Sequence, residues 1–347
     1  MNKEKIGQSF GQFYDKNYKT ILIIPIILLI ICVGYLFYFT SQNGDVIKKD
    51  ISLTGGTSIQ VNSNTSIDLL KQALSKEGFS DFSVRQVSDI LTGEQLAFII
   101  EIRDPPEKVT PFLETYLGFK LDSTNSSIEF TGSSIGGDFY TQLLLAILFA
   151  FIFMGTVVFY IFSNNTKIKV LLVVLSLIAP VLFFMMRAIT LNQAFIVSFI
   201  VLAVSIFFYA KYSIPSMAVV FCAFADIAMT VATVNLLGMQ VSSAGVVAFL
   251  MLIGYSVDTD ILLTTRVLKR HGGTINSKIW GSFKTGITMT LTSISIVIIG
   301  LILTSSFSEV LNQIFTILFI GLLFDIWNTW VTNTCMVKWY AEKHKIE

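Results

Sequence analysis

Eight long apolar segments limit what this chain of 347 residues can fold into. Each segment is close to the roughly 20 residues that a helix needs to cross the hydrocarbon core of a bilayer. Hydrophobic residues make up 53% of the chain and charged residues 14%, which is too few charges for an ordinary soluble protein. We therefore expect a polytopic α-helical membrane protein. The expected spans are 21–39, 141–162, 168–187, 194–210, 215–237, 243–264, 285–305 and 312–336.

Residues 41–139 separate the first two spans and have the composition of a soluble domain. Within 41–138 there are 8 Lys and Arg against 14 Asp and Glu, a net charge of −6. Hydrophobic periodicity predicts a β-like segment at 51–61, a helix at 66–77, strands at 82–87 and 95–102, a helix at 106–117 and a strand at 127–131. This βαββαβ order is typical of a ferredoxin-like domain. An acidic domain is not expected to bind nucleic acid, because that requires clustered Lys and Arg.

Basic residues predict the orientation of the chain in the membrane. Lys and Arg gather in the N-terminal segment, in alternate short loops and in the C-terminal tail, which the positive-inside rule places in the cytoplasm. We expect a multi-pass protein of the plasma membrane with both termini cytoplasmic. The expected parts are a cytoplasmic start and first helix (1–40), an extracytoplasmic domain (41–139), helices with an extra helix pair (140–210), a transmembrane core (211–337) and a cytoplasmic tail (338–347).

Four aspartates lie inside or at the edge of apolar segments, where a carboxylate costs a few kcal/mol. They are Asp226, Asp258, Asp260 and Asp325. Because such residues commonly mark ion pathways, we expect a proton or ion relay. Two alternatives remain, namely an interhelical hydrogen-bond clamp at Asp226 and Asp325 and a solvated Asp260 beside Arg266. The apolar body of the last four spans has no Lys or Arg, so these carboxyl groups are expected to be partly protonated or to pair with an arginine of another subunit.

Polar side chains recur at helical spacing near these aspartates. We expect them to line a polar seam between helices, although small hydroxyl residues also serve simply to let membrane helices pack closely. The seam residues are Thr230, Thr233, Tyr255, Ser256, Thr288, Thr292 and Asn328. We expect no metal site, because the two histidines, His271 and His344, lie in segments expected to be cytoplasmic, with no carboxylate at ligand spacing. We expect no cofactor and no catalytic residue, since the phosphate-loop, dinucleotide and nucleophile-elbow motifs do not occur.

Several stretches resemble one protein family. The sequence MLIGYSVDTDILLTTRVLKR at 251–270, which includes Gly254, resembles the GYS signature of SecF, an accessory subunit of the protein-export channel, in its archaeal form. The sequence DISLTGGTSIQV at 50–61, with Gly55 and Gly56, is similar to the Gly-Gly element that follows the first span in SecD and SecF. Residues 224–226 and 284–291 also fit the family's pattern.

The resemblance implies an RND-like complex (resistance–nodulation–division) with a SecD-like subunit, working beside a SecY-type translocation channel. Such a complex uses the proton motive force in late steps of the translocation of an unfolded secretory polypeptide. Asp226 would then lie on the proton path, with the 255–260 turn beside it, whereas Asp325 rests on its polar stripe alone. SecF usually has six spans, so the expected eight include a surplus of about fifty residues within 141–210.

Two other functions compete with this interpretation. A stand-alone proton-coupled RND-type transporter of a lipid or small molecule would usually carry two repeats and two outer domains in one chain. An intramembrane aspartyl protease would use Asp226 and Asp258 as a dyad, but these two positions differ in depth and a dyad needs its carboxyl groups at close range. We therefore do not expect an enzyme.

Overall fold

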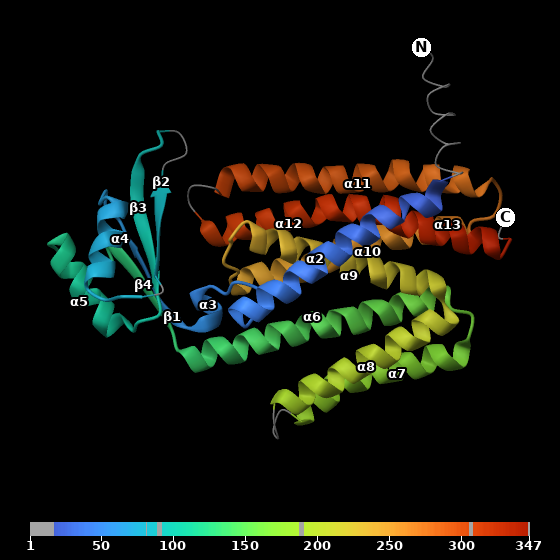
Figure 1. The fold of residues 1–347 in the computed structure, drawn as a ribbon, viewed down its shortest axis with the longest axis horizontal. Helices are drawn as coiled ribbons and strands as arrows, with labels where there is room; N and C mark the ends of the chain where they lie inside the picture. Colours follow the sequence, from blue (N-terminus) through green and yellow to red (C-terminus); the bar gives the residue numbers. More distant parts are fainter. Residues whose placement is uncertain (1–16, 81, 89–91, 187–190, 305–307, 346–347) are drawn as a thin grey trace, which may run out of the picture.

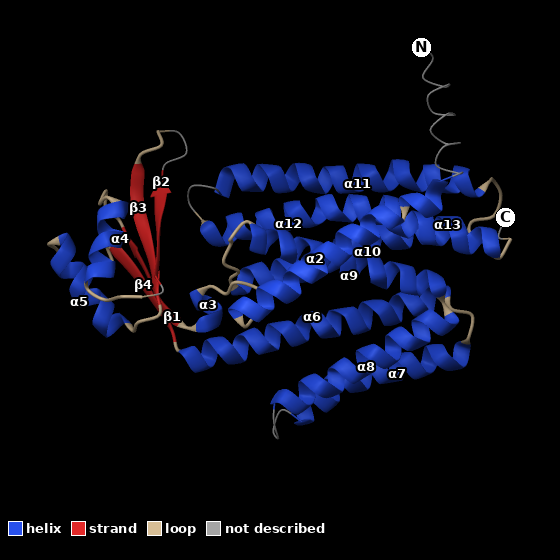
Figure 2. Cartoon of the chain, in the orientation of Figure 1, coloured by secondary structure: helices blue, strands red, loops and turns tan. Residues whose placement is uncertain are grey.

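The computed structural model describes residues 17–80, 82–88, 92–186, 191–304 and 308–345. Figure 1 shows a bundle of long helices with a small unit of strands and helices at one end. All the strands lie in that small unit, and the rest of the described chain is helical (Figure 2). The fold is thus the mostly helical membrane protein with a small sheet that the composition and the hydrophobic periodicity predict.

Within the described residues, six helical segments are long and apolar enough to cross a membrane. The first contains α2 (Ile23–Asn43) and the second lies in α6 (Ser133–Phe162). The others are α9 (Ile214–Leu236), α10 (Ser243–Lys269), α11 (Ile275–Thr304), and a last segment made of α12 (Glu309–Trp327), the π-helix η1 (Asn328–Asn333) and α13 (Thr334–Lys343).

A further helix pair lies where the surplus pair is expected. It consists of α7 (Thr166–Met186) and α8 (Leu191–Tyr212), which run beside α6 at the edge of the bundle (Figure 1). Tyr209 of α8 is fully buried against Phe159 of α6, with ring centroids 5.4 Å apart. Residues 187–190, at the boundary of two expected spans, lie outside the described residues. The count of eight spans therefore stays a prediction.

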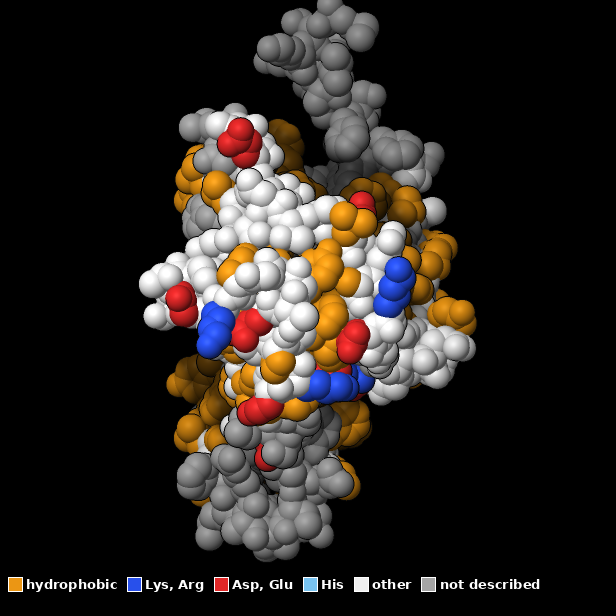
Figure 3. Space-filling model, turned by 90° about the vertical axis from the view of Figure 1, so that its left-hand side faces the viewer, with side chains coloured by type: hydrophobic (Ala, Val, Ile, Leu, Met, Phe, Trp, Pro, Cys, Tyr) orange, Lys and Arg blue, Asp and Glu red, His pale blue; other side chains and the backbone are white. Residues whose placement is uncertain are grey.

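The small unit is a four-stranded antiparallel sheet in the order β2-β3-β1-β4. Its strands are β1 (Gly56–Val61), β2 (Phe82–Ser88), β3 (Gln95–Ile102) and β4 (Ser126–Thr131), with α4 (Ile67–Lys76) and α5 (Pro106–Leu117) against one face. Alternate residues of β1 and β3, such as Ile59 and Ile100, pack on Leu70 and Leu113 of these helices. On the side turned away from the bundle, acidic and basic side chains are scattered around a band of hydrophobic ones (Figure 3).

The first half of the segment expected to be β-like is instead a short helix, α3 (Ile51–Thr54). The Asp50 side chain accepts a hydrogen bond from the backbone N–H of Ile51, and Gly55 ends the turn with φ 82°, a conformation that favours glycine. The prediction for 51–55 was therefore wrong, because local capping outweighs a short apolar alternation.

The Gly-Gly element joins the sheet to the bundle. A Cβ atom on Gly56, which has φ 148°, would lie 2.5 Å from the carbonyl oxygen of Ile102 in β3. A Cβ atom on Gly136 of α6 would lie 2.8 Å from the backbone nitrogen of Gly55. These glycines let β1, β3 and the start of the second span approach one another closely.

Candidate functional site

Three buried carboxyl groups from three different helices meet inside the bundle. Asp226 lies near the middle of α9, Asp260 in the second half of α10, and Asp325 near the end of α12. Their exposed fractions are 0%, 0% and 1%, so all three are removed from the lipid-facing surface. Hydroxyl and amide side chains lie between them and form what we call the carboxyl network.

Both oxygens of Asp226 have hydrogen-bond partners. The Ser256 hydroxyl of α10 donates to Oδ2, and Asn328 Nδ2 of η1 donates to Oδ1 at 2.7 Å. The Asn328 amide is itself held by Thr332, whose hydroxyl donates to Asn328 Oδ1 at 3.2 Å. Asp226 is therefore fixed in position by groups from two neighbouring helices.

Asp260 and Asp325 share a hydroxyl neighbour. Thr329 Oγ1 lies 2.9 Å from Asp260 Oδ1 and 3.2 Å from Asp325 Oδ1. Thr259 Oγ1 lies 3.3 Å from Asp325 Oδ1 and 3.4 Å from Thr329 Oγ1. Asn333 Nδ2 donates to Asp260 Oδ1 at 2.7 Å. Since hydroxyl groups both donate and accept hydrogen bonds, these contacts form a continuous polar connection between the two aspartates.

The π-helix η1 (Asn328–Asn333) supplies much of this network. It carries Asn328, Thr329, Thr332 and Asn333, all of which are buried. A π-helical turn is rare and often occurs at functional sites. Four of its six residues therefore bring buried polar side chains to the centre of the bundle.

Close helix packing supports the network. A Cβ atom on Gly321 of α12 would lie 2.2 Å from the side chain of Leu252 of α10, and one on Gly286 of α11 would lie 2.4 Å from the ring of Trp330. Small residues let membrane helices approach to hydrogen-bonding distance of each other's side chains. These two glycines therefore hold α10, α11 and the last span close around the aspartates.

No ion pair joins the three aspartates to a Lys or Arg in the part of the chain that the structure describes. Three buried oxygen atoms in one region also lack a hydrogen-bond partner among the described residues: Asp260 Oδ2, Thr264 Oγ1 and Asn333 Oδ1. Buried polar atoms are nearly always paired. Among the three aspartates, Asp260 is thus the one with an oxygen that is not committed to another side chain.

The structure separates the expected relay residues into two sets. Asp226, Asp260 and Asp325 come together, and Asp260 is buried rather than solvated beside Arg266, whose guanidinium donates to the carbonyl oxygen of Gly281 at 2.7 Å. Asp258 is exposed, so it does not form a dyad with the buried Asp226.

The expected seam residues likewise divide into buried residues near Asp226 and residues on exposed faces. Ser256 and Asn328 contact Asp226 directly, and Thr230 is buried but donates to the backbone oxygen of Asp226 at 2.6 Å. The Thr233 hydroxyl likewise bonds to its own helix. Three further seam residues, together with Gly254 of the GYS motif, lie on exposed faces: Tyr255, Thr288 and Thr292.

The network residues outside the expected seam include Thr259 and Asn333. Thr259 and Asn333 contact Asp325 and Asp260, respectively. Thr259 lies next to Asp260 in the GYS motif, and that adjacency was an available signal. No pattern in the sequence predicts that Asn333 points inward, because its position depends on the π-helical turn.

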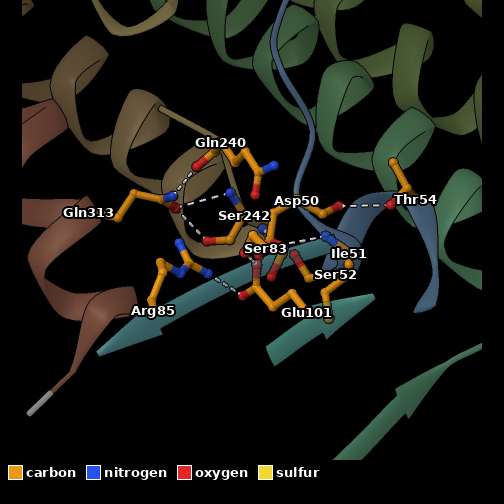
Figure 4. Close-up of polar contacts among 11 residues, drawn as sticks. Asp50, Ile51, Ser52, Thr54, Ser83, Arg85, Glu101, Gln240, Ser242 and Gln313 are labelled. Atoms are coloured by element: carbon orange, nitrogen blue, oxygen red, sulfur yellow. Dashed lines mark hydrogen bonds and ion pairs between the residues drawn. The ribbon is translucent and has the colours of Figure 1, made fainter. Parts of the chain in front are cut away.

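A second polar cluster lies outside the bundle, at the junction of the sheet with the helices (Figure 4). The Glu101 carboxylate of β3, which is 8% exposed, pairs with Arg85 of β2 and accepts a hydrogen bond from Ser83 at 3.2 Å. Burial and the neighbouring Asp50 carboxylate raise the pKa of Glu101 to about 7, against an opposing effect of Arg85.

The linker before α3 ties this junction to the bundle. The backbone N–H of Asp50 donates to the carbonyl oxygen of Val241 at 3.0 Å, and the backbone N–H of Val241 donates to the carbonyl oxygen of Lys48 at 2.7 Å. Beside them, Gln313 Oε1 of α12 accepts a hydrogen bond from the Ser242 backbone at 3.0 Å (Figure 4). A cavity of about 500 Å³ adjoins Glu101, and its charged lining also includes Asp45, Lys48, Lys49 and Arg103.

Comparison with known proteins identifies the family. Residues 185–343 match the C-terminal family of the protein export membrane proteins SecD and SecF. The chain is 31% identical over 337 residues to the protein-export membrane protein SecF of Methanocaldococcus jannaschii, covering 95% of this chain and 98% of that protein. The chain belongs to the SecF family of protein-export membrane proteins. A second SecF, from Methanolacinia petrolearia, is 30% identical over 342 residues, covering 96% of this chain and 99% of that protein.

The SecF-family assignment agrees with the fold. The crystal structure of SecDF, a translocon-associated membrane protein from Thermus thermophilus, superposes on this chain with a TM-score of 0.59 at 16% identity. The alignment covers 94% of this SecF-family chain but only 38% of the SecDF chain. At that identity the likeness concerns the fold alone.

Proposed function

We propose that this SecF-family chain is an accessory subunit of the protein-export machinery and uses the proton motive force to promote late steps of polypeptide translocation. The carboxyl network of Asp226, Asp260 and Asp325 is the observation that carries this proposal. Three buried carboxyl groups without a counter-charge in the described residues are costly to keep in a membrane, and a proton pathway is the function that uses them.

In this proposal Asp226 takes up the proton near the middle of the membrane and Asp260 passes it on. The hydroxyl groups of Ser256, Thr259 and Thr329 lie along the route between the aspartates. Each hydroxyl can accept a proton on one side and donate one on the other. The uncommitted Oδ2 of Asp260 is the acceptor at the end of the network that lies nearer the end of α10.

We further propose that the chain works with a SecD-like subunit, beside a SecY-type channel, on an unfolded secretory polypeptide. The SecDF chain is much longer than this one, and this chain covers 38% of it. The remainder is what a SecD-like partner would supply. A cationic residue of that partner would offset the charge of the carboxyl network, since the described residues form no ion pair with it. The three carboxyl groups are buried within this chain, so the helices around them would have to separate for such a residue to reach them.

The same proposal includes the topology expected from the sequence. Both termini would be cytoplasmic, residues 41–139 would form a ferredoxin-like domain outside, and α7 and α8 would bring the number of spans to eight. The antiparallel order β2-β3-β1-β4 with two helices on one face supports that domain type. Lys338 and Lys343 near the end of α13 support a cytoplasmic C-terminus.

A matched pair of variants tests the proton pathway. Asp226→Asn removes the ionisable group while keeping the shape, and Asp258→Asn makes the same change at an exposed position of the GYS motif. Both variants would be co-expressed with the SecD-like partner, and export into energised vesicles would be measured with and without an uncoupler.

We expect Asp226→Asn to leave the complex intact and abolish the uncoupler-sensitive part of export, while Asp258→Asn retains it. Uncoupler-sensitive export by the Asp226→Asn variant at the level of the unmodified chain would refute the proton pathway.

A further inference from the structure

A groove lies at the end of the bundle opposite the sheet unit, where the first span begins and α13 ends (Figure 1). Its volume is about 390 Å³. The first span, α9 and α13 form its walls, with the side chains of Leu22, Ile26, Met217, Phe221, Met336 and Trp339. None of these residues belongs to the carboxyl network or to the junction with the sheet, so neither of those sites accounts for the groove.

The groove opens on the surface that a membrane-spanning chain presents to lipid. The first span exposes most of its apolar side chains, among them Ile23, Ile27 and Ile30. Side chains on such a surface lie among acyl chains of similar polarity. An apolar groove beside them therefore suits an acyl chain better than it suits a polar solute.

One lysine lines the groove and a second lies over the ring of Trp339, which is one of the lining residues. The first is Lys19, and the second is Lys343, whose Nζ atom lies 5.6 Å from the centroid of the Trp339 ring. Neither lysine forms an ion pair within the ranges that the structure describes. Trp and Tyr are the residues that concentrate at the membrane–water interface, so the position of Trp339 places this end of the groove, which we call its mouth, at the level of lipid headgroups.

The acidic residue at this mouth is already engaged. Glu342 accepts a hydrogen bond from the Tyr18 hydroxyl at 2.6 Å, and Lys338 Nζ lies 4.0 Å from its other carboxylate oxygen. Its negative charge is therefore offset by neighbours in the chain. The mouth keeps a net positive charge from Lys19 and Lys343.

We propose that this groove binds one anionic phospholipid, with an acyl chain between the first span and α13 and its phosphate between Lys19 and Lys343. Basic pockets between membrane helices are typical binding sites of anionic headgroups. A zwitterionic lipid would offer the same acyl chains but would bring a cationic choline group to two lysines. Preference for the anionic lipid is thus the property that distinguishes a built site from ordinary lipid contact.

Native mass spectrometry of the purified full chain in a neutral detergent tests the proposal, with phosphatidylglycerol and phosphatidylcholine of identical acyl chains as the probes. We expect one phosphatidylglycerol to bind in preference. Replacing both Lys19 and Lys343 with Gln should weaken the binding of phosphatidylglycerol roughly 30-fold, because each lysine near an anionic headgroup contributes about 1 kcal/mol. Leu22→Trp should fill the groove and abolish retention of the lipid. Lys169→Gln is the control, because Lys169 also lies over an aromatic ring, that of Tyr160 at 5.0 Å, but lines none of this groove.

Equal retention of the two lipids, or unchanged binding of phosphatidylglycerol by the double Gln variant, would overturn the proposal. A second measurement does not depend on those variants. Phosphatidylglycerol with brominated acyl chains should quench the fluorescence of Trp339 more than brominated phosphatidylcholine does, and the difference should vanish in Trp339→Phe. An equal difference in that variant would show that the lipid binds elsewhere.

Discussion

Replacing Glu101 with Gln should remove a pH dependence from the junction between the sheet and the bundle. Glu101 is buried on β3, and burial together with the Asp50 carboxylate raises its pKa from an ordinary value of 4.5 to about 7. Because the carboxyl group is harder to ionise when the junction is closed, the closed junction binds the proton more tightly than the open one. Closure is therefore favoured at low pH and weakened as the pH rises.

The size of this effect follows from the difference in pKa. A change from 4.5 to about 7 corresponds to about 3 kcal/mol, which is an upper value because the open junction need not expose Glu101 completely. Below about pH 4.5 the penalty is absent, and it grows until the pH passes about 7. Glu101→Gln cannot ionise, so the stability of its junction should be flat over this range.

Hydrogen exchange of the backbone amides of Asp50 and Val241 measures the junction directly, because these two groups bond the linker to the loop before α10. After correction for intrinsic exchange rates, their protection in the unmodified chain should fall between pH 5 and 8, and in Glu101→Gln it should stay constant. Glu129→Gln on the exposed edge of the same sheet serves as the control and should behave like the unmodified chain. A Glu101→Gln variant with an undiminished pH dependence would refute this reasoning.

Three further substitutions test the packing and the network. Gly321→Ala should lower the stability of the protein in detergent by about 1–3 kcal/mol, since the new methyl group would overlap Leu252. Gly254→Ala is the control, because a Cβ atom there meets nothing within 4 Å, and equal melting temperatures of the two variants would contradict the close packing. Thr329→Val keeps the shape but removes the hydroxyl between two aspartates, so uncoupler-sensitive export should slow while complex formation persists, and an unchanged rate would exclude this hydroxyl from the route. Leu113→Ala, at a fully buried position of the sheet unit, should cost about 2–5 kcal/mol in chemical unfolding of that unit, and a loss below 1 kcal/mol would count against the described core.

The order of strands and helices in the sheet unit was predictable from the sequence because one face of each element is apolar and the other polar. The bounds expected for the strand at 95–102 and the helix at 106–117 agree with β3 (Gln95–Ile102) and α5 (Pro106–Leu117). The short helix α3 (Ile51–Thr54) was missed because four residues contain too little periodicity to outweigh an apparent alternation.

The orientation of the membrane helices was harder to predict. In a lipid environment both faces of a helix are apolar, so periodicity does not reveal which face meets another helix. The hydroxyl stripe of Thr288 and Thr292 on α11 consequently lies on an exposed face. Asp258 and Asp260 are two positions apart and so point about 200° apart around a helix, yet the sequence alone did not show which of them faces inward.

The π-helix η1 (Asn328–Asn333) also acts as a one-residue offset in the last span. Compared with an uninterrupted α-helix of the same sequence, a turn that takes up one extra residue rotates everything after it by about 100° and shortens the helix by about 1.5 Å. The face of α13 that brings Glu342 to the Tyr18 hydroxyl is therefore set by how η1 is wound. Winding the same six residues as an α-helix would leave Asp325 in place and rotate the end of the chain away from the first span. The winding of η1 therefore determines which surface the chain's last helix presents to the start of its first.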